Sequence, residues 1–203
     1  MKGIYKLFIF LFFITQYVAF SQKDVYSFSL LTDKSTIEWE GKKVLGAHNG
    51  NVNFLSGFLK IKNNMITGGE FVVDMTTIIN TDIDDKEYSD KLVKHLKSED
   101  FFNVSKYKKS FFKITKAEPY KDKGNSNLNF KIYGDLTIKG IKKPISFPAI
   151  LRFEDNGIFA RAKFAIDRTK WNIKYKSNSI FSGLGDKFIY DDIWFEMDLY
   201  FGK

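Results

Sequence analysis

The stretch LNFKIYGDLTIKG, Leu128 to Gly140, alternates apolar and polar residues over most of its length. One side would carry Leu, Phe, Ile, Gly, Leu and Ile, and the other Asn, Lys, Tyr, Asp, Thr and Lys. Because successive side chains of a strand point to opposite faces, this period predicts a strand of about 11 residues with one apolar face. Gly134, in the middle of the apolar face, predicts a bend or a bulge.

The same period of two recurs from residue 35 to residue 200, with turn residues between the runs. Asn156-Gly157 separates two such runs and predicts a hairpin. We count about eight strands, without an internal repeat or a low-complexity segment. Many antiparallel strands with one apolar face must stack or close to bury it, and long strands with a glycine bend favour a barrel. The fold class is therefore predicted as all-β, an eight-stranded antiparallel barrel.

One segment, Asp84 to Phe102, breaks the alternation and predicts a short helix. Ser89 or Asp90 is a suitable N-terminal cap, and acidic residues precede it. Leu92, His95 and Leu96 follow at helical spacing, so we expect them to share one face. His95 would then point inward with the leucines or lie at the edge of that face.

Residues 1–21 have the layout of a secretory signal peptide. Lys2 and Lys6 precede an apolar run, and Ala19 and Ser21 are small residues at the −3 and −1 positions of a cleavage site. The run is short for a membrane span, although an uncleaved anchor is the alternative. We predict a periplasmic or secreted protein with one domain over residues 22–203.

Composition excludes several classes of function. The chain has no cysteine, which rules out disulfides, thiol catalysis and cysteine metal sites. Removing residues 1–21 lowers the formal charge from +8 to +6, and the lysines are scattered. We read this charge as a solvated surface with weak attraction to anionic membranes, and we predict no nucleic-acid partner.

Five motifs follow one another in an order that resembles the YceI-like family. These motifs are STIEWEGKKVLGAHNGNVNFLSG, GGEFVVDMTTI, LVKHLKSEDFFNVSKYKKSFFKI, GDLTIKGIKKPISFPA and FAIDRTKWNIKY. The resemblance covers about residues 34 to 201. It departs at Lys108, where many members carry proline, and over Ser177–Asp186, which is hard to match.

The resemblance implies an extended, lipocalin-like barrel with one helix packed at an end. It also implies a lengthwise hydrophobic tunnel for a polyisoprenoid or similar amphiphile, and no established catalytic activity. We therefore predict a binding protein, not an enzyme, whose ligand is a polyisoprenoid, an isoprenoid quinone or a fatty acyl lipid. Transient membrane contact and a homodimer formed at open barrel edges are further expectations. No cofactor is predicted besides such a ligand.

Strand parity selects the residues that would line this tunnel. They are Phe54, Phe71, Val73, Phe112, Ile114, Phe130, Ile132, Leu136, Ile138, Phe164, Ile166, Phe195 and Met197. Parity does not separate residues that touch a ligand from residues that fill space. A filled barrel without a ligand, acting in the cell envelope, stays an alternative.

Polar candidates for the end of the tunnel are His48, His95, Asp74 and Arg168. The glycines at 46 and 50 would let His48 turn inward, where it is a head-group contact or a structural histidine. Arg168 is either a bidentate donor to a carboxylate or phosphate, or part of a buried ion pair. Asp74 is either a solvent-facing residue or a partner of histidine or arginine.

The two histidines do not predict a metal site or a hydrolase. They lack the spacing of paired zinc ligands, and no Gly-x-Ser-x-Gly elbow accompanies them. The remaining alternative is a quinone-linked redox accessory or enzyme in which His48 or His95 assists proton transfer.

Overall fold

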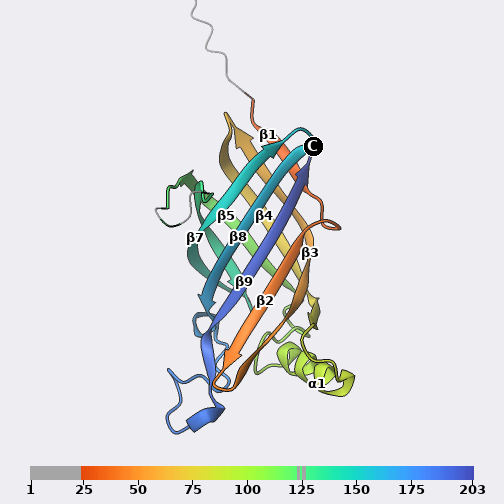
Figure 1. Cartoon of the computed structure of the whole chain (residues 1–203), viewed down its shortest axis with the longest axis vertical. Coiled ribbons are helices and arrows are strands. Elements are labelled where there is room, and N and C mark those ends of the chain that lie inside the picture. Colours follow the sequence, from red (N-terminus) through yellow and green to blue (C-terminus); the bar gives the residue numbers. More distant parts are fainter. Residues whose placement is uncertain (1–23, 123, 125–126) are drawn as a thin grey trace, which may run out of the picture.

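The computed structural model describes residues 24–122, 124 and 127–203, so the predicted signal peptide lies outside the described residues. The chain forms long antiparallel strands and one α-helix within that part (Figure 1). The strands are β1 (Tyr26–Leu30), β2 (Thr36–Lys43), β3 (Gly46–Lys62), β4 (Met65–Asn80), β5 (Lys109–Pro119), β6 (Phe130–Ile138), β7 (Ile141–Glu154), β8 (Gly157–Asp167) and β9 (Ile189–Gly202). The helical segments are α1 (Lys86–Lys97), the 3-10 turn η1 (Arg168–Trp171) and the 3-10 turn η2 (Gly185–Lys187).

Eight of these strands close a barrel in the order β3, β2, β9, β8, β7, β6, β5, β4 and back to β3. The ninth strand, β1, lies end to end with β2 in the wall. β2 pairs with residues 46–51 of β3, whereas β1 pairs with residues 58–61 of the same strand and with the end of β9. The predicted eight-stranded antiparallel barrel is thus confirmed. Because the circuit is closed, edge pairing gives no basis for the predicted homodimer.

The inner face follows from the alternation of the sequence. Phe130, Ile132 and Ile138 of β6 are buried, as their parity predicts. Gly134 makes room for its neighbour, because a Cβ there would lie 2.5 Å from the Phe112 ring. The irregularity predicted near Gly134 lies on the facing strand, where the register of β5 shifts between Ile114 and Lys116.

Tight turns join the strands at Asn63-Asn64 and Lys139-Gly140, all four with positive φ. The hairpin expected at Asn156-Gly157 is present, but its two turn residues are Asp155 and Asn156, and Gly157 already pairs with Glu154. Pairing therefore starts one residue earlier than the Asn-Gly signal indicates.

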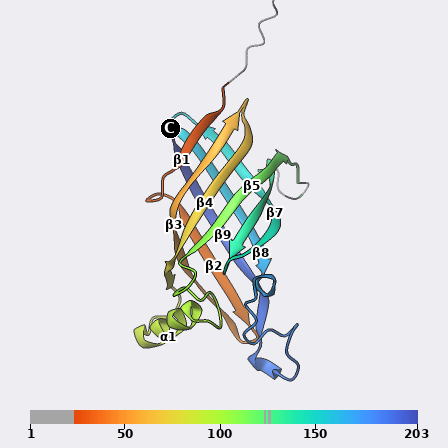
Figure 2. The same cartoon turned by 180° about the vertical axis from the view of Figure 1, so that it is seen from behind.

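The predicted helix is confirmed in a shorter form, and its cap differs from the prediction. Asp85 is the N-terminal cap and accepts a hydrogen bond from the Tyr88 N–H at 3.1 Å. Ser89 and Asp90 lie inside the first turns, so the prediction of either as cap was wrong. The helix packs on β4 near one end of the barrel and buries Leu96 (Figure 2). No helix among the described residues is both long and apolar enough to cross a membrane.

The barrel has two different ends. The helix end carries α1, the β2–β3 hairpin, η1 and the loop 172–188 that leads to β9. The far end carries β1, the β3–β4 and β7–β8 turns and the end of β9 (Figures 1 and 2).

Candidate functional site

A cavity of about 240 Å³ lies inside the barrel. Twelve of the thirteen residues predicted to line a tunnel do line this cavity. The exception is Ile166, which is buried in the wall near the helix end. Parity therefore placed these side chains on the correct face, whereas their contact with a ligand stays a prediction.

Several inward-facing apolar side chains keep accessible surface although they point away from bulk solvent. They come from six successive strands and are Val73, Phe112, Leu136, Ile145, Phe164 and Phe195. In a filled barrel such side chains would touch each other and lose that surface. Their surface faces the cavity, so the barrel interior is hollow at this level.

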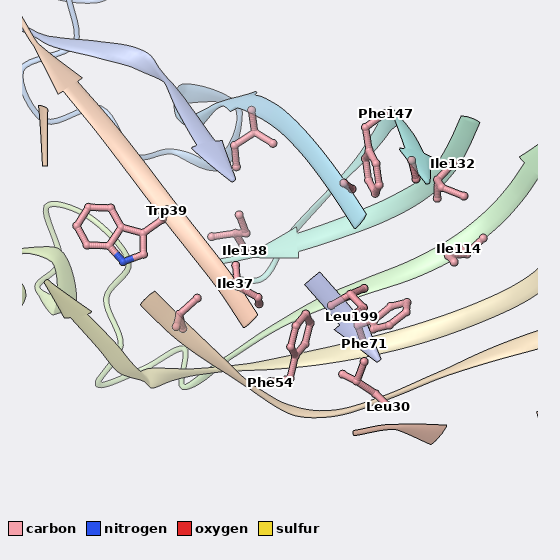
Figure 3. Close-up of a cluster of buried hydrophobic side chains, with 14 of the residues drawn as sticks. Leu30, Ile37, Trp39, Phe54, Phe71, Ile114, Ile132, Ile138, Phe147 and Leu199 are labelled. Atoms are coloured by element: carbon pink, nitrogen blue, oxygen red, sulfur yellow. The ribbon is translucent and has the colours of Figure 1, made fainter. Parts of the chain in front are cut away.

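Phenylalanine rings follow one another around the inner wall. Successive ring centroids are 6.2 Å apart for Phe54 and Phe71, 6.4 Å for Phe71 and Phe112, and 5.6 Å for Phe112 and Phe147. The series continues from Phe147 to Phe164 at 4.2 Å and from Phe164 to Phe195 at 5.8 Å. These contacts make the wall stiff and apolar, which suits a hydrocarbon chain. Figure 3 shows three members of the series, Phe54, Phe71 and Phe147, within the buried apolar cluster.

Phe147 and Ile145 belong to the lining but were absent from the predicted set. They lie on β7, where Ile145, Phe147, Ala149 and Leu151 alternate and would have given the signal. Pro144 and Pro148 interrupt that pattern, because proline argues against a strand inside a sheet. Trp39, Lys43 and the partner of His48 were also missed.

The inner faces of β2 and β3 change from apolar to polar toward the helix end. On β2 the inner positions run Ile37, Trp39, Gly41 and Lys43, and on β3 they run Phe54, Val52, Gly50 and His48. Other polar residues of the lining, Lys42, Ser110, Arg168 and Tyr190, come from the same end, while Arg161 lies on the outer face of β8. The polar groups of the lining are thus concentrated at the helix end.

His48 lines the cavity at the helix end and keeps 29% of its side chain exposed. Its Nδ1 lies 2.9 Å from Asp82 Oδ2, and its Nε2 lies 3.2 Å from Lys43 Nζ. Burial raises the pKa of Asp82, but hydrogen bonds from Asn49, His48 and Asn80 outweigh this, and the pKa is lowered overall. A charged Asp82 favours Nδ1–H, which leaves Nε2 free to accept from Lys43.

His95 does not line the cavity. Its Nε2 lies 3.1 Å from Asp100 Oδ2, and its ring packs edge-on against Phe101 and Tyr175 with centroids 5.0 and 4.6 Å away. It lies at the edge of the buried helix face, which is one of the two positions expected for it. The two histidines therefore occupy separate surroundings.

Arg168 is 1% exposed and stabilises the helix end from within. Its guanidinium donates to the carbonyls of Tyr190, Ile173 and Ile189 at 3.2, 2.9 and 3.1 Å. Nη2 also lies 3.3 Å from Asp191 Oδ1. Burial lowers the pKa of Arg168, whereas Asp191 and Asp167 raise it. These contacts match the buried ion pair, with Asp191 as the partner.

Asp74 is absent from the cavity lining and bonds within its own strand. It accepts hydrogen bonds from the Thr76 N–H and hydroxyl at 2.9 and 2.6 Å. The hydroxyl bond is the main cause that lowers the pKa of Asp74. The structure therefore gives it a solvent-facing position, and no histidine or arginine of the described part of the chain is its partner.

The described residues contain no group of three or more His, Asp or Glu side chains that could hold a metal ion. His48 and His95 have different acidic partners, Asp82 and Asp100. The cavity combines an apolar wall with polar groups at the helix end.

A family model described as YceI-like domain matches residues 28–201. A UPF0312 protein of Vibrio parahaemolyticus is 34% identical over 116 residues, which cover 51% of this chain and 58% of that relative. A UPF0312 protein of a Shewanella species is 43% identical over 56 residues, or 28% of this chain and 27% of the relative. These matches span about half or less of the relatives' length.

Two solved structures share the fold. Burkholderia cenocepacia BcnA superimposes with a TM-score of 0.64 at 18% identity, over 84% of this chain and 98% of that chain. A polyisoprenoid binding domain from Saccharophagus degradans, described as implicated in plant cell wall breakdown, gives a TM-score of 0.59 at 12% identity. That match covers 86% of this chain and 97% of the domain. At these identities the likeness concerns the fold.

Proposed function

The chain belongs to the YceI-like domain family, and from this premise we propose that it binds one long-chain amphiphile in the barrel cavity. The ligand class is a polyisoprenoid, an isoprenoid quinone or a fatty acyl lipid, which the protein sequesters or carries. The observation that carries the proposal is the set of inward-facing apolar side chains that keep accessible surface around the cavity.

Burial of the chain supplies the binding free energy. Each methylene removed from water contributes about 0.8 kcal/mol. Ordering a flexible chain and associating it with the protein offset a large part of this gain. The stiff wall of phenylalanine rings reduces the cost of ordering the protein, because these side chains already pack against one another.

The fold of the Saccharophagus degradans polyisoprenoid binding domain supports this choice of ligand. A hollow interior also favours binding over the filled-barrel alternative, because the inward-facing apolar side chains keep surface that a bound chain would cover. Specificity would come from the length of the cavity and from the polar groups at the helix end.

We place the protein in the periplasm or outside the cell, on the strength of residues 1–21. Export brings a lipid carrier to the membranes that would donate and accept its cargo. Amino-terminal sequencing of the exported protein tests this placement, and Gln22 is the expected first residue. An intact Met1 on protein retained in the cytoplasm would contradict it.

Transient membrane contact fits the loop between η1 and β9. Ile180 and Phe181 are 42% and 46% exposed there, and the loop lies at the helix end of the barrel (Figure 1). Exposed large apolar side chains on a loop are typical of contact with a partner or a membrane. Contact through this loop would bring the polar end of the cavity to the lipid surface.

Mass spectrometry of the purified protein tests the binding function directly. A stoichiometric adduct seen under native conditions, and extracted by solvent as a long-chain lipid or quinone, is the expected result. Bare protein, also after incubation with polyprenyl phosphate, quinone and fatty acid, would contradict the proposal.

A pair of variants on β8 adds a structural control. Ala160 lines the cavity, whereas Ala165 lies outside the lining on the other face of the same strand. Ala160→Phe should fill the cavity and abolish the adduct, and Ala165→Phe should retain it. Equal adducts in both variants would place the ligand elsewhere.

A quinone-linked redox accessory is the second candidate, and the position of His48 in the cavity lining favours it. The pairing of its imidazole with the Asp82 carboxylate has the composition of a proton relay. His48→Gln would then abolish quinone-linked activity while quinone binding persists. His95 lies outside the lining, so His95→Gln serves as the matched control.

A further inference from the structure

Trp39 carries a buried hydrogen-bond donor without a partner. Its side chain lies on the inner face of β2, is 9% exposed and lines the cavity. Among described residues, Nε1 of Trp39 and Oδ1 of Asp191 are the buried side-chain atoms with no hydrogen bond. Asp191 Oδ1 at least faces the Arg168 guanidinium at 3.3 Å. The Trp39 indole N–H has no such compensation.

An unsatisfied buried donor costs about 1–3 kcal/mol, so proteins rarely keep one without a reason. Trp171 shows the usual solution, because its Nε1 donates to the Leu136 carbonyl at 3.1 Å. Trp39 differs from Trp171 in that it borders an open cavity. A bound molecule with an oxygen acceptor would satisfy it.

Gly50 fixes the place of the Trp39 ring. Trp39 and Gly50 are directly paired across β2 and β3. A Cβ at residue 50 would lie 2.7 Å from Cζ2 of Trp39 and 1.9 Å from the Ile79 carbonyl oxygen. The ring therefore occupies space that only glycine leaves free. This packing holds the indole N–H in a defined position. Figure 3 shows Trp39 at one edge of the labelled apolar cluster.

Positive charge lies beyond Trp39 toward the helix end. The next inner pair is Gly41 with His48, and the pair after it is Lys43 with Gly46. Each step along the strand pair is about 7 Å. None of the ion pairs among described residues involves Lys43, whereas Lys42 is paired with Glu40 at 3.1 Å. The Asp82 carboxylate is held by His48, Asn49 and Asn80, so its charge is partly compensated.

We infer that the Trp39 indole N–H, with Lys43 on its solvent side, is the binding site for an anionic oxygen head group, a carboxylate or a phosphate, of a long-chain ligand. The apolar chain then runs from Trp39 toward the far end along the phenylalanine wall. This inference rests on the proposed function and adds the chemical class and the orientation of the ligand. From the far end toward solvent, the site would present the apolar wall for the chain, then the Trp39 indole N–H, and then the Lys43 ammonium.

Nuclear magnetic resonance of the indole groups tests this site in the unmodified protein. The chain has three tryptophans, so a 15N-labelled sample gives three indole N–H signals. The probes are hexadecanoic acid, geranylgeranyl phosphate and, as a head-free control, hexadecane. The acid, the phosphate or both should move the Trp39 signal downfield, as expected when the N–H gains a charged acceptor. Trp171 should stay in place because its N–H is already bonded.

Variants assign the effect to single groups. Trp39→Phe removes the donor and keeps an aromatic ring, and it should weaken binding of the preferred head-bearing probe by about tenfold or more. Trp194→Phe, at an exposed position on β9, should leave binding unchanged. Lys43→Gln should weaken the same probe by about two- to fivefold, because its ammonium is largely solvated. Hexadecane binding should be the same in all variants.

The outcomes separate the two levels of the proposal. If the acid or phosphate binds but shifts the Trp39 signal no more than hexadecane does, and Trp39→Phe binds it equally well, the head-group site is wrong and the cavity function stands. If no probe binds, the cavity function itself fails. A response to one head group alone identifies it as a carboxylate or a phosphate.

Discussion

The two ends of the barrel share the same strands but are closed by different means. At the far end, β1 continues the line of β2, and the apolar side chains of Leu30, Ile158 and Phe201 are buried. At the helix end, α1, η1 and the loop 172–188 cover the strands instead. There the inner surface carries His48, Lys43 and the buried Arg168.

The difference indicates the direction in which a ligand would lie. The apolar side chains at the far end offer no hydrogen-bond partner, so burying a polar group of a ligand there would cost free energy. The helix end supplies donors and positive charge near solvent. A barrel with this asymmetry suits a molecule with one polar end and one long apolar end.

The largest effect on stability is expected for the buried Arg168, and the exposed Arg161 serves as its control. Arg168→Met should lower the free energy of unfolding by about 3–5 kcal/mol, because three carbonyls and Asp191 lose a buried cation. Arg161 forms an exposed pair with Asp198, and Arg161→Met should cost within about 1 kcal/mol. Urea unfolding of both variants measures the difference. Equal losses would mean that Arg168 does not stabilise the helix end.

Two glycines on the β2–β3 hairpin give the next effect. Gly50→Ala places a methyl group against the Ile79 carbonyl and the Trp39 ring, and should cost about 1–3 kcal/mol. Gly41→Ala adds a methyl group with nothing within 4 Å, at ordinary φ, and should be neutral within about 0.5 kcal/mol. Thermal melts compare them. A neutral Gly50→Ala would show that the Trp39 ring can move.

The helix cap gives a smaller effect at the same end. Asp85→Ala removes the acceptor for the Tyr88 N–H and should cost about 1 kcal/mol. Asp90→Ala removes an exposed pair with Lys86 and should cost no more than about 0.5 kcal/mol. Far-ultraviolet circular dichroism during urea unfolding measures both. A larger loss of stability in Asp90→Ala than in Asp85→Ala would indicate that Asp90 is the N-terminal cap, as the sequence predicted.

Acid should weaken the His48–Asp82 contact, which is the smallest effect. The folded-state pKa of Asp82 lies below its usual value, so its contribution is present above the unfolded pKa of about 3.9 and is lost as pH falls through the folded pKa. The stability difference between the wild type and Asp82→Asn should therefore shrink below pH about 4. Asp84→Asn, which forms no bond with other described residues, is the control. A difference constant to pH 2 would contradict the assignment.

Much of the interior was readable from the sequence, because strand alternation is local. Phe112, Phe164 and Phe195 each stand at the correct parity within their own runs, and all line the cavity. The helix around Leu96 was predicted for the same reason. Its cap was not, since Asp85, Ser89 and Asp90 are all chemically suitable, and only backbone geometry chooses Asp85.

The polar end was less predictable, because its contacts join residues far apart in the chain. His48 and Asp82 are 34 positions apart, and Arg168 bonds to carbonyls about 20 residues away. Every residue has a backbone carbonyl, so a sequence does not show which carbonyls a side chain will contact. The residues next to Arg168 in the chain therefore could not decide between a head-group contact and a buried ion pair. Asp74 was an equally good candidate by sequence, yet it bonds to Thr76.

The sequence by itself determined that this protein is an all-β barrel with an apolar inner face, because apolar and polar residues alternate along each strand. Tertiary structure decided that the barrel is hollow, which polar side chains meet at the helix end, and that the Trp39 donor has no partner among the described residues. The physical reason is that parity fixes the direction of a side chain. The space in front of it depends on how eight strands close around one another.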